Sequence, residues 1–327
     1  MRAKALGTTG LIVTPIGLGL AAVGRPGYIN LGRDADLGSD RSVEALAWRS
    51  YELLDAAHAA GIRYVDTARS YGLAEAFLAS WLDRRGLSRI DLTVGSKWGY
   101  TYTAAWRSDA VAHEVKDHSL PTLRRQLAES RDLLGDRLRL YQVHSATLES
   151  GVLRDQDVLA ELTRLRGEGL SIGLTVSGPR QADVVRRALE VEVDGLNPFA
   201  SIQATWNILE PSAGPALAEA HAAGWGVIVK EALANGRLTS HSMGSAARAL
   251  GRLAARYSAP VDALAIAAAL ANPWADVVLS GAVTVDQLRG NLGALELSLT
   301  PGDGDALSAL AEPPDRYWAT RKALPWS

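Results

Sequence analysis

The chain has 327 residues, a formal net charge of −2 and no cysteine. The near-neutral charge gives no electrostatic reason to expect nucleic acid or an acidic membrane as a partner. The missing cysteines exclude disulfides, thiolate nucleophiles and cysteine-ligated metals, and no histidine spacing suggests a metal site. The first residues lack the apolar core of a signal peptide and no apolar run reaches membrane-spanning length, so we expect a cytoplasmic protein.

Strand-like and helix-like segments alternate along the chain. Strands are expected over residues 12–20, 63–66, 92–97, 138–144, 171–177, 201–205, 226–230 and 277–280. Helices are expected over residues 41–60, 74–84, 119–135, 156–167, 181–189, 212–223, 245–257, 262–271 and 285–295, with a glycine-rich loop over 24–40. Strands joined by crossover helices predict an α/β fold, the (β/α)8 TIM barrel. No segment has the composition of a linker, so we expect residues 1–327 to form one domain.

Four ionisable residues lie at or just beyond the ends of expected strands, namely Asp66, Tyr71, Lys97 and His144. In a (β/α)8 barrel these strand ends meet at one mouth, where barrel enzymes carry out their chemistry. A free phenol titrates near pKa ~10, and a nearby ammonium lowers that pKa. We therefore expect Tyr71 to transfer a proton, with Lys97 tuning it and Asp66 holding Lys97. His144 would orient a carbonyl oxygen.

Each of the four residues also has a structural interpretation. A strand-end aspartate often caps the next helix, a loop tyrosine usually packs, and a single strand-end histidine is more often structural. Lysine, however, occurs only at positions 4, 97, 116, 230 and 322, and a buried lysine is rare unless it is paired or functional. The joint pattern is much less expected by accident than any one member, and it predicts a proton-transfer site.

The segments that carry these residues resemble the aldo-keto reductases. The stretches concerned are Gly61-Ile-Arg-Tyr-Val-Asp-Thr-Ala-Arg-Ser-Tyr-Gly72, Gly95-Ser-Lys-Trp-Gly99, residues 136–144, residues 173–177 and residues 280–291. Leu6 to Pro15 is similar to the family's N-terminal β-hairpin, which closes the bottom of the barrel. The resemblance implies a barrel with extra C-terminal helices and a tail, a nicotinamide cofactor, and Tyr71 as the proton donor.

The resemblance also implies where the cofactor binds. Ser177 and Gln203 would hold the nicotinamide carboxamide, and Asn291 would contact the adenine. The other implied contacts are Lys230, Ala232, Asn235, Arg237, Gly281, Val283 and Gln287. Lys230 replaces an aromatic residue that stacks on the nicotinamide, and it is open whether Lys230 contacts phosphate, contacts substrate or is a plain strand-end charge. Asn235-Gly236 is similar to a pyrophosphate loop, with an ordinary turn as the alternative.

Cofactor choice follows from three of these positions. Gly281, Val283 and Gln287 fall where NADP-preferring members often carry a cation, which a 2′-phosphate normally requires. We therefore expect weak discrimination, with Arg237 or Arg289 as substitute cations, and family habit slightly favours NADP(H) over NAD(H).

The expected function is NAD(P)H-dependent reduction of an aldehyde or ketone, or the reverse reaction. Tyr28, Trp98 and Trp106 lie on loops expected at the mouth and suit an apolar, aromatic or sugar-like substrate. The aromatic tail over residues 317–326 either lines this pocket or packs against the barrel wall or a neighbouring subunit. The sequence does not decide whether the protein forms a homo-oligomer. The alternatives are an NAD-dependent sugar 1-dehydrogenase and a cofactor-binding barrel that acts as a redox sensor. The intact tetrad favours an enzyme.

Overall fold

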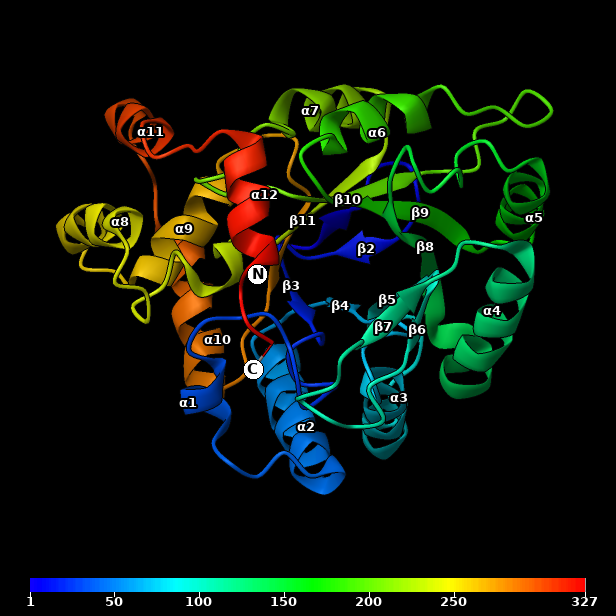
Figure 1. Ribbon diagram of the computed structural model, residues 1–327, viewed down its shortest axis with the longest axis horizontal. Helices are drawn as coiled ribbons and strands as arrows, with labels where there is room; N and C mark the ends of the chain where they lie inside the picture. The colour runs from blue at the N-terminus through cyan, green and yellow to red at the C-terminus, as the bar shows by residue number, and fades with distance from the viewer. Residues whose placement is uncertain (327) are drawn as a thin grey trace.

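The computed structural model describes residues 1–326, and its centre is a closed barrel of parallel strands surrounded by helices (Figure 1). In barrel order the strands are β3 (Ile16–Gly19), β4 (Tyr64–Asp66), β5 (Thr93–Trp98), β8 (Leu138–Ala146), β9 (Ser171–Val176), β10 (Ser201–Thr205), β11 (Gly226–Lys230) and β12 (Val277–Ser280). The last strand, β12, pairs with β3 and closes the barrel. The expected (β/α)8 fold is confirmed.

Helices cover the outside of this barrel. They are α2 (Val43–Ala59), α3 (Ala74–Arg85), α4 (Leu120–Leu134), α5 (Gln156–Gly167), α6 (Gln181–Leu189), α7 (Gly214–Ala222), α8 (Ser245–Arg256), α9 (Val261–Leu270) and α10 (Val285–Leu292). Several begin at a side chain that caps the backbone N–H groups of the first turn, as Ser42, Ser119 and Thr284 do. Their apolar faces pack on the buried strands, which places the core between the barrel and the helices.

The N-terminal segment differs from the single strand expected over residues 12–20. Pro15 interrupts it, since proline has no N–H to donate to a sheet. Before Pro15, β2 (Ile12–Val13) pairs antiparallel with β1 (Lys4–Ala5), and after it β3 enters the barrel. Gly7 in the hairpin turn has a φ of +49° and lies so close to Gly226 that a Cβ would reach 2.3 Å from its backbone nitrogen. The hairpin implied by the resemblance is therefore present and fits closely.

Additional elements lie around the barrel mouth. A two-stranded ribbon, β6 (Tyr100–Tyr102) with β7 (Glu114–Lys116), follows β5, and a short helix, α1 (Arg33–Leu37), interrupts the glycine-rich loop. These elements are too short to give a periodic pattern, so the sequence did not indicate them. The C-terminal segment forms α11 (Pro301–Ser308) and α12 (Pro314–Lys322). In Figure 1, α1 lies beside α10 and α2.

Within residues 1–326 no single helix has the length and apolar character needed to cross a bilayer. The consecutive helices α8 and α9, which are bent by 87° relative to each other, have that length and composition only when the two are taken together.

Candidate active site

The four ionisable residues meet at a cavity of about 580 Å³ at the C-terminal ends of the strands. Asp66 ends β4, Lys97 lies on β5 and His144 on β8, while Tyr71 lies in the loop after β4. Tyr71, Asp66 and His144 line the cavity directly. Lys97 lies just behind them, almost completely buried. The barrel thus brings together residues that are up to 78 positions apart in the printed sequence, from 66 to 144.

Lys97 connects the carboxylate to the phenol. Its Nζ forms an ion pair with one oxygen of Asp66, donates to the Thr67 carbonyl at 2.9 Å, and lies 3.4 Å from the Tyr71 hydroxyl. The other oxygen of Asp66 accepts hydrogen bonds from other side chains, so its position is fixed from both sides: the donors are Tyr64 Oη at 2.9 Å and Gln203 Nε2 at 2.9 Å. The ammonium is therefore held against the Tyr71 oxygen by a fully buried frame.

The phenol of Tyr71 is held in its protonated form. Burial raises the pKa of Tyr71 well above its usual value, the charge of Asp66 raises it further, and the Arg25 guanidinium acts in the opposite direction. The sequence had suggested that an ammonium would lower this pKa, but burial and the charge of Asp66 act in the opposite direction and prevail. At neutral pH Tyr71 therefore carries a proton that it can donate.

His144 is a neutral imidazole. Burial lowers its pKa well below the usual value, and the charges of Lys97, Lys230 and Arg25 lower it further. Its Nδ1 lies 3.4 Å from the Ser70 hydroxyl. If Ser70 donates there, the proton of the neutral ring lies on Nε2. His144 can then donate a hydrogen bond to a carbonyl oxygen without competing with Tyr71 as an acid.

Sequence reasoning missed Arg25, which joins three aromatic rings at the site. Its guanidinium carbon lies 5.3 Å from the ring centres of Tyr71 and Tyr28 and 5.0 Å from that of Trp326. It also donates to the Ser70 carbonyl at 3.0 Å and to Glu114 at 2.9 Å. A single arginine in a glycine-rich loop gives no motif, so only the fold reveals this role.

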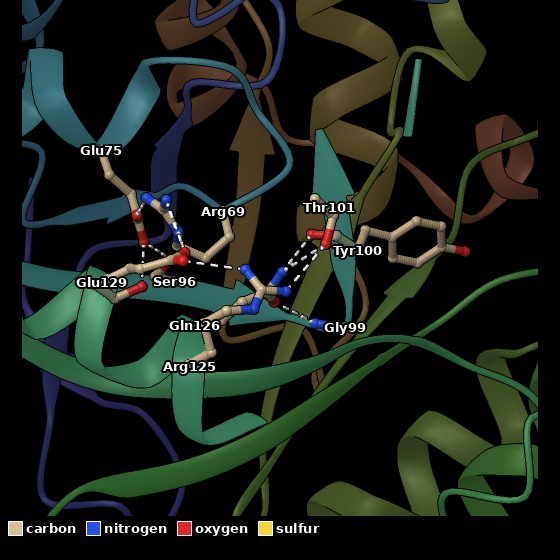
Figure 2. Close-up of polar contacts among 10 residues, drawn as sticks. Arg69, Glu75, Ser96, Gly99, Tyr100, Thr101, Arg125, Gln126 and Glu129 are labelled. Atoms are coloured by element: carbon tan, nitrogen blue, oxygen red, sulfur yellow. Dashed lines mark hydrogen bonds and ion pairs between the residues drawn. The ribbon is translucent and has the colours of Figure 1, made fainter. Parts of the chain in front are cut away.

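A second layer of polar contacts supports the loop before Tyr71 and the chain just after β5 (Figure 2). Gln126 on α4 accepts from Gly99 N at 2.8 Å and donates to the Tyr100 carbonyl at 2.9 Å, which fixes the chain just after β5. In the same view the Tyr100 ring points away from these contacts, and its centre lies 5.0 Å from that of His144. These contacts thus fix the position of Tyr100, whose ring forms one side of the cavity.

Glu75 is the buried centre of the other half of Figure 2. It forms an ion pair with Arg69, and its carboxylate accepts from Ser96 at 2.5 Å and Ser130 at 2.7 Å. The backbone N–H of Arg69 in turn donates to the Lys97 carbonyl at 3.1 Å. Glu75 therefore stabilises the loop between β4 and Tyr71.

Replacing Glu75 with leucine should lower the free energy of unfolding by roughly 2–3 kcal/mol, because Arg69 and two hydroxyls lose a buried acceptor. Urea denaturation monitored by circular dichroism measures the change. Glu129→Leu is the matched control, since Glu129 also pairs with Arg69 but is partly exposed, and it should cost less than about 1 kcal/mol. Equal costs for the two variants would contradict a special role for Glu75.

Most residues implied as cofactor contacts lie on the cavity. They are Ser177, Gln203, Lys230, Ala232, Asn235, Gly281, Gln287 and Asn291. Asn235 and Asn291 are buried, and within residues 1–326 the Oδ1 atom of each accepts no hydrogen bond. Open acceptors of this kind fit the amino and hydroxyl donors of a nucleotide. The lining therefore fits an extended dinucleotide that runs from the tetrad to α10.

Two implied cofactor contacts lie away from the cavity. Arg237 forms an ion pair with Glu312 and stacks over the Tyr317 ring at 5.5 Å, so its charge is already matched. Val283 is buried in the main core, and its backbone N–H donates to Gln287 Oε1 at 2.9 Å. Arg289, the other substitute cation, is exposed and pairs with Asp286.

The aromatic residues expected in the substrate pocket are divided. Tyr28 lines the cavity, whereas Trp98 and Trp106 do not. Successive residues of a strand point to opposite faces, so an inward Lys97 turns Trp98 outward, where it packs against the His118 ring at 5.6 Å. Trp106 donates to the Arg41 carbonyl at 2.9 Å and packs on Phe77. Tyr100 and Trp326 line the cavity instead.

The C-terminal tail takes both of the roles that the sequence left open. Tyr317 and Trp318 pack into a cluster with residues of α8 and α9, outside the cavity. Further along, Arg321 and Trp326 line the cavity, and Trp326 stacks on His113 with ring centres 4.0 Å apart. The end of the tail therefore forms part of the cavity wall near Tyr71.

Comparison with known proteins gives consistent likenesses. The chain matches the model of the Aldo/keto reductase family over residues 35–312. It is 25% identical to the NADH-specific methylglyoxal reductase of Escherichia coli K12, over 97% of this chain and 100% of that protein. It is 27% identical to the aldo-keto reductase ausK of Aspergillus calidoustus, over 90% of this chain and 77% of that protein. The holo form of the aldo-keto reductase AKR11C1 from Bacillus halodurans has a similar fold, with a TM-score of 0.70, 24% identity and coverage of 96% and 97%.

Proposed function

The chain belongs to the aldo-keto reductase family, and on that premise we propose that it reduces an aldehyde or ketone with a nicotinamide dinucleotide. The observation that carries the proposal is the Lys97 ammonium, which lies 3.4 Å from the Tyr71 hydroxyl beside a neutral His144 at the floor of the cavity. An acid, its cationic neighbour and a neutral donor converge where a carbonyl oxygen can lie.

In the proposed reaction, each side chain acts on the carbonyl oxygen or on its neighbour. His144 donates a hydrogen bond that orients the oxygen. Tyr71 transfers its proton to the oxygen as negative charge develops, and Lys97 stabilises the phenolate left behind. The bound nicotinamide supplies the hydride. Asp66 touches no reacting atom and holds Lys97 in place.

Among substrates, the wall formed by Tyr28, Tyr100 and Trp326 supports a small carbonyl compound with an apolar or aromatic body. The experiment that tests the function follows NADH and NADPH absorbance with a panel of aliphatic, aromatic and dicarbonyl aldehydes and ketones. Sugars and alcohols with the oxidised cofactors test the reverse direction. Cofactor binding without turnover of any compound would contradict the proposal and favour a sensor.

For the cofactor, we propose NADH in place of the slight sequence-based preference for NADPH. The end of the cavity near Gln287 and Asn291 carries the carboxylates Asp36 and Asp262, together with Asp286, which pairs with the exposed Arg289. Among residues 1–326 no lysine or arginine lines that end. Asp36, in α1, accepts a hydrogen bond from Gln287 Nε2, in α10, at 2.6 Å, and this bond connects the two helices. A 2′-phosphate here would meet negative charge, whereas ribose hydroxyls would meet acceptors.

Asp36→Asn should tighten NADPH binding by about 3- to 10-fold and leave NADH binding nearly unchanged, because a partly exposed charge is removed while the amide oxygen still accepts from Gln287. Titration of both cofactors by calorimetry measures the effect. Asp34→Asn is the matched control, since Asp34 lies in the same helix, pairs with Arg41 and is absent from the cavity wall. Equal gains for both cofactors would place the ribose elsewhere.

A further inference from the structure

Lys230, at the end of β11, brings a positive charge to the cavity wall beside the tetrad. Its Nζ donates to Ser177 Oγ and Thr205 Oγ1, both at 3.0 Å. Among residues 1–326, no carboxylate forms an ion pair with it. Both of these hydrogen-bond partners are neutral hydroxyls. They satisfy the ammonium of Lys230 but do not neutralise its charge.

The neighbouring Glu231 is occupied by another cation. Arg321 from α12 donates from Nε to both oxygens of Glu231, at 3.0 and 2.9 Å, and Thr205 donates to the same carboxylate at 3.0 Å. Burial acts to raise the pKa of Glu231, but Arg321 and Lys230 outweigh it and lower that pKa to about 2. Glu231 is therefore ionised, and Arg321 matches its charge, which leaves the positive charge of Lys230 in excess.

The position of Lys230 places this excess charge where the nicotinamide has to lie. Under the proposed function, Ser177 holds the carboxamide, and the reacting carbon of the ring faces Tyr71 and His144. Ser177 Oγ is also 3.3 Å from Ser145 Oγ, on the residue that follows His144. A ring held between Ser177 and His144 would therefore lie next to the Lys230 ammonium.

We propose that Lys230 makes the site select the reduced form of the nicotinamide over the oxidised form, an inference that rests on the proposed function. The reduced ring is neutral. When its C4–H bond breaks, the hydride leaves with both electrons for the carbonyl carbon, Tyr71 gives its proton to the oxygen, and the ring becomes a cation. Lys230 repels that cation, so the oxidised form binds more weakly and the site favours carbonyl reduction.

The selectivity should depend on pH. Burial lowers the pKa of Lys230 to about 8, with Arg321 and Lys97 lowering it as well and Glu231 and Asp66 acting against them. His144, which also faces this region, is neutral because its own pKa lies well below the usual value. The ammonium is present below pH 8 and is lost above it, so the preference for the reduced form should weaken as pH rises from 7 to 9.5.

The test measures dissociation constants of NADH and NAD⁺, and of NADPH and NADP⁺, by calorimetry at pH 7. The wild-type protein should bind the reduced form on the order of tenfold more tightly or better, and Lys230→Met should reduce that ratio by on the order of tenfold. Lys230→Arg should keep the ratio and make it independent of pH, because arginine stays protonated. Lys322→Met is the matched control, since Lys322 is exposed on α12 and outside the cavity.

The outcomes separate the two proposals. If neither form of either cofactor binds, the proposed function fails. If both forms bind but the ratio is the same in wild type, Lys230→Met and Lys322→Met, the function stands and the role of Lys230 is wrong. Should Lys230→Met not fold, the pH series decides alone: a wild-type ratio that is constant from pH 7 to 9.5 overturns the inference.

Discussion

Replacing Tyr71 with phenylalanine should lower the rate of carbonyl reduction at least ~10²-fold while leaving cofactor affinity nearly unchanged. The phenol lies beside Lys97 and its pKa lies well above the usual value, so at neutral pH it carries the proton that the proposed reaction transfers. The ring itself remains in the variant and still packs against Arg25 and His144. Steady-state kinetics with the best carbonyl of the panel, together with calorimetric cofactor titration, measures both quantities.

Tyr102→Phe is the matched control, because it removes a phenolic hydroxyl that accepts from the Trp106 backbone at 3.2 Å outside the cavity. It should leave the rate within a few-fold of wild type. A Tyr71→Phe variant with near-normal turnover would contradict the assignment of the proton donor. A loss of cofactor affinity equal to the loss of rate would instead assign Tyr71 a binding role.

The sequence predicted the barrel and the meeting of the tetrad because both follow from local patterns. Buried parallel strands give apolar runs, and each run that ends in an ionisable residue predicts a polar strand end at the mouth. Asp66, Lys97 and His144 fit this pattern, so their convergence needed no knowledge of long-range contacts. Pro15, read as part of a strand, shows how one residue without an N–H moves a boundary.

The remainder of the site depends on contacts between distant segments, which no local pattern records. Arg321 reaches Glu231 from a tail helix 90 positions away, and Gln287 meets Asp36 across 251 positions. The same limit explains why Val283 was expected to contact the cofactor. The position of a residue in a motif does not give the direction in which its side chain points. In the structure that side chain lies in the core. A cation introduced at this position would start from the core and not from the cavity wall, so cofactor choice has to be tested at Asp36 instead.

Lys97→Met is expected to slow turnover and to raise the pKa of Tyr71 further, because the phenol loses the ammonium that lies 3.4 Å from it while the charge of Asp66 remains. The same titration governs both directions of the reaction, since reduction needs the phenol and oxidation needs the phenolate. The basic limb of the reduction profile and the acidic limb of the oxidation profile should both move to higher pH. Rates measured from pH 6 to well beyond pH 10, up to the highest pH at which the protein stays folded, follow the shift.

This variant should also lose stability, which has to be separated from its catalytic effect. Removing one partner of a buried ion pair costs about 3–5 kcal/mol, and Asp66 keeps only its bonds from neutral donors such as Tyr64 and Gln203. The double variant Asp66→Asn with Lys97→Met removes both charges and should recover much of this loss in urea denaturation, but little of the activity. Recovery of both would make Lys97 a structural residue. An unchanged pH profile in a folded Lys97→Met protein would show that the ammonium does not tune Tyr71, because the 3.4 Å contact would then carry no influence on the proton that is transferred.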